Sequence, residues 1–252
     1  MLQNIFRNMP PVVKNLLLIN VVLLLANFVF LSQNTNLNGI LGAYYWGSEH
    51  FEPYQIITHM FMHDNQGLMH ILFNMFALVM FGGQIERVWG PKRFLIYYLV
   101  CGLGAYLLHN IVNGIEIQNL LANLSSSQTD LFMTEGFEHI ENGKVFTSMP
   151  QETQLGLYYA YNTPMVGASG AVFGLLAAFA WLFPNTELML LFPPIPIKAK
   201  WFVLMYGGLE IYLGYQAFGS QGDSIAHFAH IGGALIGLII LLIWQKNKSK
   251  FY

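Results

Sequence analysis

The sequence predicts an all-α, polytopic membrane protein built as a bundle of six transmembrane helices. Composition is the first indication: 55% of the 252 residues are hydrophobic, only 10% are charged, and the mean hydropathy is +0.47. Soluble domains carry about 25% charged residues. The second is a series of apolar runs close to the roughly 20 residues that a helix needs to cross a bilayer. The third is the uneven distribution of basic residues between the segments that join these runs.

The first half of the chain holds three of the expected spans. The first covers residues 12–31, and a polar, aromatic-rich connection follows over residues 32–53. Aromatic side chains of this kind are typical of the membrane interface. A second helix is expected over residues 67–82, a turn over residues 82–90, and a third span over residues 93–111.

Residues 113–162 interrupt this pattern. They carry six acidic side chains against the single Lys144, together with a run of three serines. Such a segment is too polar for the membrane interior. We expect a long, non-cytoplasmic loop inserted between the third and fourth spans.

Three further spans complete the expected bundle. The fourth belongs to an apolar run that opens near Met165 and is closed by Pro184, and a proline-rich loop follows it. The fifth span is expected over residues 201–218 and the sixth over residues 225–244. A basic tail, residues 245–252, ends what we expect to be a single membrane domain over residues 1–252.

The basic residues predict the orientation. If the spans alternate, all but one of the eleven lysines and arginines fall on one side: Arg7, Lys14, Arg87, Lys92, Arg93, Lys198, Lys200, Lys246, Lys248 and Lys250. The positive-inside rule then places both termini in the cytoplasm. We expect a multi-pass protein of a prokaryotic inner membrane. No basic tract is present, so no nucleic-acid partner is expected, and no cleavable signal peptide is evident.

Ser169 lies near the start of the fourth span and has two explanations. Small residues allow helices to approach closely in lipid, and Gly170 and Gly174 form a pair at the spacing that favours such packing. Alternatively, Ser169 is a nucleophile at a helix start, with Gly167 beside it to bind or orient a substrate. The second explanation requires a base elsewhere in the chain.

The sixth span supplies the candidate base. Ionisable residues inside a membrane are functional candidates, because they are costly to bury. His230 lies at a depth close to that of Ser169, and Gly233 and Gly237 repeat the glycine spacing of the fourth span. A close approach of the two helices would allow His230 to activate the serine hydroxyl.

Two neighbours of this pair have smaller expected roles. Phe173 follows Ser169 by one helical turn and could stack on the His230 ring. His227 is expected only to line the mouth of the site. The competing explanation of His230 is a histidine satisfied by a backbone carbonyl.

His70 and Asn74 share one face of the second helix, because they are four residues apart. Both can donate hydrogen bonds without a formal charge, which suits an oxyanion hole completed by the backbone N–H of Ser169. The alternative is a polar pair that holds two helices together.

Taken together, these residues resemble the rhomboid family of intramembrane serine proteases. The resemblance covers most of the chain and rests on the serine motif Gly167-Ala168-Ser169-Gly170, the histidine helix with Ala229, His230, Gly233 and Gly237, the HxxxN pattern of His70 and Asn74, and a turn with Glu86, Gly90, Arg93 and Phe94. It implies a rhomboid-like six-helix core, a Ser169–His230 dyad without an acid, and an oxyanion hole that includes His70 and Asn74. The expected partners are transmembrane protein substrates and the lipid bilayer.

Two features depart from the family pattern. The loop at residues 113–162 is longer than the minimal core needs, and the connection over residues 44–54 lacks the Trp-Arg pair of many members.

Other functions are weighed against the protease. A catalytically silent rhomboid-like binding protein would generally have lost the serine or the histidine, and both are present. A metal site is a further alternative, because His59, His63 and His70 fall within one short segment and His227 lies three residues before His230. The sequence has no HExxH motif and no carboxylate placed as a base, so we expect no zinc hydrolase, no metal and no cofactor. Glu210, in the middle of the fifth span, favours a transporter unless it is a bundle-facing carboxyl hydrogen-bonded to a neighbouring helix.

Overall fold

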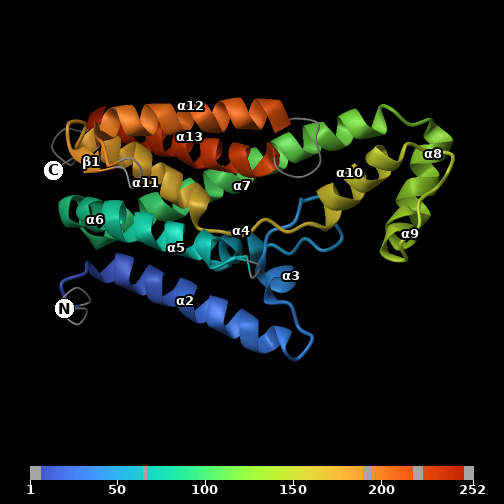
Figure 1. Cartoon of the computed structure of the whole chain (residues 1–252), viewed down its shortest axis with the longest axis horizontal. Helices are drawn as coiled ribbons and strands as arrows, with labels where there is room; N and C mark the ends of the chain where they lie inside the picture. The colour runs from blue at the N-terminus through green and yellow to red at the C-terminus, as the bar shows by residue number, and fades with distance from the viewer. Residues whose placement is uncertain (1–6, 65–66, 190–193, 218–223, 247–252) are drawn as a thin grey trace.

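The computed structural model describes residues 7–64, 67–189, 194–217 and 224–246, and six helical segments form its bundle (Figure 1). They are α2 (Pro11–Leu31), the continuous segment of α5 (Leu68–Ala77), η2 (Leu78–Gly82) and α6 (Gly83–Trp89), then α7 (Pro91–Leu121), α11 (Ser169–Leu182), α12 (Ala199–Ala217) and α13 (Ser224–Lys246). Within the described residues, four segments are long and apolar enough to cross a membrane: α2, α5–α6, α7 and α13. The chain is a polytopic helical membrane protein, as predicted.

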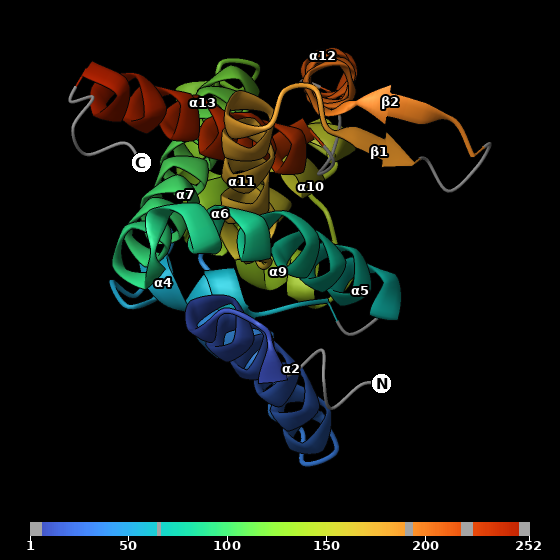
Figure 2. The same cartoon turned by 90° about the vertical axis from the view of Figure 1, so that its left-hand side faces the viewer.

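Helix α11 lies at the centre of the bundle, surrounded by the other helices (Figure 2). All residues from Gly170 to Phe179 are buried. Its 14 residues give a length of about 21 Å, which is shorter than the roughly 30 Å hydrocarbon core of a bilayer. At least one end of α11 therefore lies within the thickness of the membrane.

Glycines set the distance between α11 and α13, as their spacing predicted. A Cβ atom added to Gly233 would overlap the carbonyl oxygen of Gly170, and one added to Gly237 would lie 3.2 Å from the Cα of Gly174. Helix α7 joins this contact, because the Tyr97 hydroxyl donates a hydrogen bond to the carbonyl oxygen of Gly174 (2.8 Å). The backbones touch where larger side chains would hold them apart.

The second helix continues past the turn expected over residues 82–90. Gly82 and Gly83 are both helical, because Gly82 ends the π-helical turn η2 and Gly83 begins α6, and the chain turns at Gly90 with a φ of 76°. Tertiary contacts outweigh the helix-breaking tendency of the glycines. The Glu86 carboxylate accepts the backbone N–H groups of Val12 and Val13 (2.9 and 2.8 Å), which caps the start of α2.

Helix α7 also runs further than expected, to Leu121 and not to residue 111. Its last turns are held by a lobe made of α8 (Ser126–Leu131), η3 (Phe132–Gly136), α9 (Phe137–Glu141) and α10 (Gln151–Asn162), which projects from one end of the bundle (Figure 1). Asn113 donates to the carbonyl oxygen of Ala160 (2.9 Å), and Ile117 is buried with Phe132 and Leu157 in a small separate core. The first part of the expected loop is thus helix, and the rest has its own packing.

The fourth span begins at Ser169, because residues before it are extended. Met165 exchanges two backbone hydrogen bonds with Ala43 (2.9 and 2.8 Å). The 32–66 connection, which contains Ala43, also holds three short helices, α3 (Leu37–Leu41), α4 (Gln55–Thr58) and η1 (His59–Phe61).

Two short strands depart from the all-α expectation. They are β1 (Glu187–Met189) and β2 (Pro196–Lys198), paired antiparallel where a stiff loop was expected. The turn expected between α12 and α13 and the tail beyond residue 246 lie outside the described residues.

Candidate active site

Ser169 is the first residue of α11 and is half-buried. Gly167 precedes it with a φ of 126°, a backbone conformation that side-chain-bearing residues rarely adopt. The N–H of Gly167 donates to the carbonyl oxygen of His59 (3.0 Å), so this glycine shapes the turn. Ala168 provides no side-chain cap, and the first N–H groups of a helix have no intrahelical acceptors. These donors are available to a negatively charged oxygen near Ser169.

His70 lies beside Ser169. A Cβ atom added to Gly167 would be 2.9 Å from Nε2 of His70 and 3.5 Å from Oγ of Ser169, so both atoms border the same small space. Nδ1 of His70 accepts the backbone N–H of Asp64 (3.5 Å). A neutral ring with its proton on Nε2 matches this long contact and would present that N–H toward the space beside Ser169.

Asn74 occupies the same helix face but makes a different contact. Its side chain is buried, and Nδ2 donates to the carbonyl oxygen of His70, one turn earlier (3.0 Å). This bond uses one of the two amide hydrogens and leaves the second for another acceptor.

His230 is positioned by the aromatic ring of Phe173. The two rings are stacked, with centroids 4.3 Å apart and planes within 7°. Phe173 also contacts Tyr206 of α12, with ring centroids 4.9 Å apart. Among the hydrogen bonds of the described residues, none joins Ser169 to His230. The two residues lie on α11 and α13, whose backbones are in direct contact at Gly170 and Gly233.

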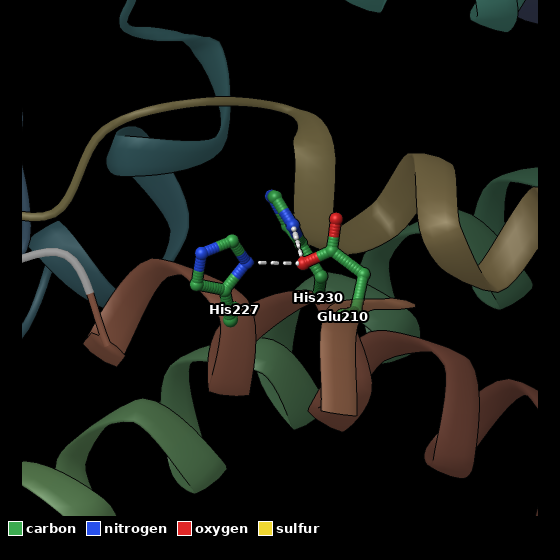
Figure 3. A group of neighbouring side chains, drawn as sticks. All are labelled: Glu210, His227 and His230. Atoms are coloured by element: carbon green, nitrogen blue, oxygen red, sulfur yellow. Dashed lines mark hydrogen bonds and ion pairs between the residues drawn. The ribbon is translucent and has the colours of Figure 1, made fainter. Parts of the chain in front are cut away.

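A carboxylate completes the surroundings of His230 (Figure 3). Oε2 of Glu210 accepts hydrogen bonds from Nδ1 of His227 (2.6 Å) and Nδ1 of His230 (3.0 Å). Glu210 is only 4% exposed. With a proton on Nδ1, the lone pair of His230 is on Nε2, the nitrogen that a general base needs.

The structure shows Glu210 as a bundle-facing carboxyl bonded to a neighbouring helix, which is one of the two explanations that the sequence left open. Sequence reasoning missed its contact with His230. A signal was present, because an unpaired carboxylate in an apolar helix is costly and Glu210 therefore needs a polar partner. His227 shares this carboxylate, since its Nδ1 also donates to Oε2 of Glu210.

His59 and His63, which precede α5, are both buried but make different contacts. His59 donates from Nδ1 to the carbonyl oxygen of Gln55 (2.9 Å), and the His63 ring lies 5.0 Å from that of His70. Burial lowers the pKa of each, His59 and His63, from 6.5 to about 4, so both are neutral near pH 7. Among the described residues, the one group with donor atoms close enough for a metal ion is Glu210, His227 and His230, and the segment of His59, His63 and His70 forms none.

Comparison with known proteins identifies the family of the domain. A family model described as the Rhomboid domain matches residues 50–122 and 144–247. It leaves out residues 123–143, which contain α8, η3 and α9.

Three curated relatives show the range of similarity. The chain is 27% identical over 199 residues to RHOMBOID-like protein 12, mitochondrial, of Arabidopsis thaliana (78% of this chain, 48% of that protein). It is 26% identical over 141 residues to the Rhomboid protease GlpG of Haemophilus influenzae (54% and 72%), and 26% identical over 185 residues to the Rhomboid protease AarA of Providencia stuartii (73% and 53%). The chain spans about half the length of the Arabidopsis and Providencia proteins.

Proposed function

The chain belongs to the rhomboid family, and we propose from this membership and the geometry around Ser169 that it is an intramembrane serine endopeptidase. Two relatives are named as rhomboid proteases. One observation carries the proposal, the placement of the His230 ring. This ring stacks on Phe173, which follows Ser169 by one helical turn, and its Nδ1 donates a hydrogen bond to Glu210. This leaves Nε2 of His230 as the nitrogen free to act on the serine.

In the proposed reaction, Nε2 of His230 takes the proton of Ser169 as Oγ attacks the carbonyl carbon of a substrate peptide bond. The resulting oxyanion accepts hydrogen bonds from Nε2–H of His70, the free amide hydrogen of Asn74 and the backbone N–H of Ser169. The C–N bond then breaks, and His230 returns the proton to the departing amine. Water then attacks the acyl-enzyme while Nε2 of His230 takes one of its protons. The bond between the carbonyl carbon and Oγ of Ser169 breaks, and His230 returns the proton to Oγ.

Glu210 has a positioning role in this scheme. Its carboxylate keeps the Nδ1–H tautomer of His230 and resists rotation of the ring, while Phe173 supports the ring face. Glu210 also stabilises the imidazolium that forms when His230 accepts the serine proton.

The proposed substrates are transmembrane segments of other membrane proteins. A helical backbone hides its carbonyl groups in internal hydrogen bonds, so the substrate must unwind locally beside Ser169. Water must also reach the site, and the half-buried position of Ser169 is compatible with access from the side of the polar connections.

The membrane and the orientation are proposals too. The placement of both termini in the cytoplasm follows from the positive-inside rule alone. Relatives come from bacteria as well as from mitochondria and chloroplasts, so they do not support the expected prokaryotic inner membrane over an organelle membrane.

The second candidate function is a catalytically silent rhomboid-like protein that binds membrane proteins. One assay separates it from the protease: cleavage of a model transmembrane substrate by the purified protein in detergent, compared with Ser169→Ala. We expect cleavage that depends on Ser169, survives EDTA and is blocked by a serine-phosphonylating reagent. Absence of cleavage with several substrates, together with retained binding of those substrates, would favour the silent protein.

A further inference from the structure

Glu210, His227 and His230 form a compact group of three ligand-type side chains at the contact of α12 and α13 (Figure 3). Each side chain offers one donor atom, and these three atoms lie within 4.8 Å of one another. The Glu210 carboxylate is buried, whereas the side chains of His227 and His230 are 23% and 19% exposed. The carboxylate is therefore enclosed by the protein, and both imidazole rings are partly accessible from its surface.

We propose that these three residues bind a zinc ion, and that bound zinc inhibits the enzyme. Two imidazoles and one carboxylate are an established ligand set for zinc, with a fourth position left for water. Magnesium and calcium prefer oxygen ligands, so a site with two nitrogens disfavours them.

The distances suit a tetrahedral ion. Zinc–nitrogen and zinc–oxygen bonds of about 2.0–2.2 Å place neighbouring ligand atoms roughly 3.4 Å apart. Oε2 of Glu210 lies 2.6 Å from Nδ1 of His227 and 3.0 Å from Nδ1 of His230. Replacing the two shared protons with one ion requires each pair to separate by less than about 1 Å, which rotation of the side chains can supply.

The inhibition follows from the tautomer of His230 and rests on the proposed role of this residue as the base. Without metal, Nδ1–H is bonded to Glu210, and the lone pair on Nε2 is free to accept the serine proton. When zinc binds Nδ1, the ring proton moves to Nε2. His230 then has no lone pair to offer Ser169, and the nucleophile is not activated.

Metal binding is measured first in a protein that cannot turn over. Chelator-treated Ser169→Ala protein in detergent is titrated with zinc by calorimetry, and one zinc ion per chain is expected. In the same background, Glu210→Gln and His227→Ala should each raise the Kd for zinc at least 10-fold. The matched control is His50→Ala, which removes an exposed histidine 3.9 Å from Glu49 and should leave the Kd unchanged. A Kd unaffected by both cluster variants would overturn the zinc site, as would the absence of binding.

Inhibition is tested on the active protein. Zinc should lower the rate of cleavage of a model transmembrane substrate, and magnesium should not. Glu210→Gln can still accept the Nδ1–H of His230 through its amide oxygen, but it loses the carboxylate that zinc requires. Its half-inhibiting zinc concentration, relative to its own zinc-free rate, should rise at least 10-fold.

The binding measurement and the inhibition measurement test different parts of the proposal. Zinc bound at the cluster with cleavage at the zinc-free rate would disprove the tautomer argument. A protein without any cleavage would contradict the proposed function, and the calorimetry would still decide whether the metal site exists.

Discussion

The rings of Phe173 and His230 lie parallel, with centroids 4.3 Å apart and an angle of 7° between their planes. Phe173 belongs to the same helix as Ser169 and follows it by one turn, so the stack joins the proposed nucleophile and the proposed base through one side chain. The alignment depends on the register of α11 against α13, which the facing glycines set.

Ser169→Ala and His230→Ala should each reduce cleavage of a transmembrane substrate to background, because either change removes the activated hydroxyl. The double variant should be no slower than the single variants, since residues that act as a unit show non-additive effects. Turnover is measured on purified protein in detergent, with thermal unfolding as the check on folding. Full turnover by Ser169→Ala would disprove the dyad.

His70→Ala should lower kcat by about 10²–10³, the range measured for loss of one oxyanion donor. Asn74→Ala should cost less, because one of its amide hydrogens is already bonded to the backbone of its own helix. Steady-state kinetics for both variants provide the measurement. Unchanged kcat in both would assign the pair to helix packing, the alternative that the sequence left open.

Glu210→Ala should lower kcat about 10²-fold with little change in KM, because the base loses its orientation and not its substrate. Glu210→Gln should retain more activity, since the amide oxygen can still accept the Nδ1–H of His230. A purely structural role would instead lower the thermal stability of both variants in step with their activity.

Gly233→Ala should destabilise the protein by about 1–3 kcal/mol and disturb the Ser169–His230 alignment, because the new methyl group would overlap the carbonyl oxygen of Gly170. Gly207→Ala is the matched control: an added Cβ there meets no atom within 4 Å. Melting temperature and kcat are compared for the two. Equal behaviour of the variants would show that the close glycine contact does not hold these helices.

The free energy of unfolding should fall as the pH is lowered, because His63 is buried in the folded protein. Its pKa is about 4 in the folded state and 6.5 when unfolded, so the unfolded state binds more protons between these values. The contribution of the neutral His63 to the free energy of unfolding is fully present above pH 6.5. It is lost as the pH falls toward 4, to a total of about 3 kcal/mol.

His63→Leu should therefore flatten the dependence of melting temperature on pH between 6.5 and 4. At pH 7 it should be neutral or stabilising, because both ring nitrogens of His63 are buried and have no hydrogen-bond partner among the described residues. His50→Leu is the control, since the His50 side chain is exposed to solvent in the folded protein. An unchanged slope in His63→Leu would contradict the assignment.

The sequence alone determined the class of the protein and most of its helices. Apolar runs of membrane-spanning length are a local property, and the burial of backbone hydrogen bonds in lipid leaves a helix as the structure that such a run adopts. The glycine pairs of α11 and α13 were readable for the same reason: their spacing places them on one face of each helix, and close packing was the evident use for them.

Helix ends were decided by tertiary contacts. The Gly82-Gly83 pair predicts a turn by propensity, yet the helix continues because Glu86, four residues on, caps α2. Helix α7 passes residue 111 because Ile117 is buried by a lobe from elsewhere in the chain. Propensity differences of about 1 kcal/mol per residue are easily outweighed by such contacts.

The two neighbours of His230 also differ in whether the sequence could predict them. Phe173 was predictable as its neighbour, because a spacing of four residues fixes the face that Phe173 shares with Ser169. Glu210 was not, because its partner depends on how α12 is rotated against α13, and the spacing of residues within one helix carries no information on that rotation. Only the folded bundle brings the one carboxylate of α12 against the two histidines of α13, within hydrogen-bond distance of both.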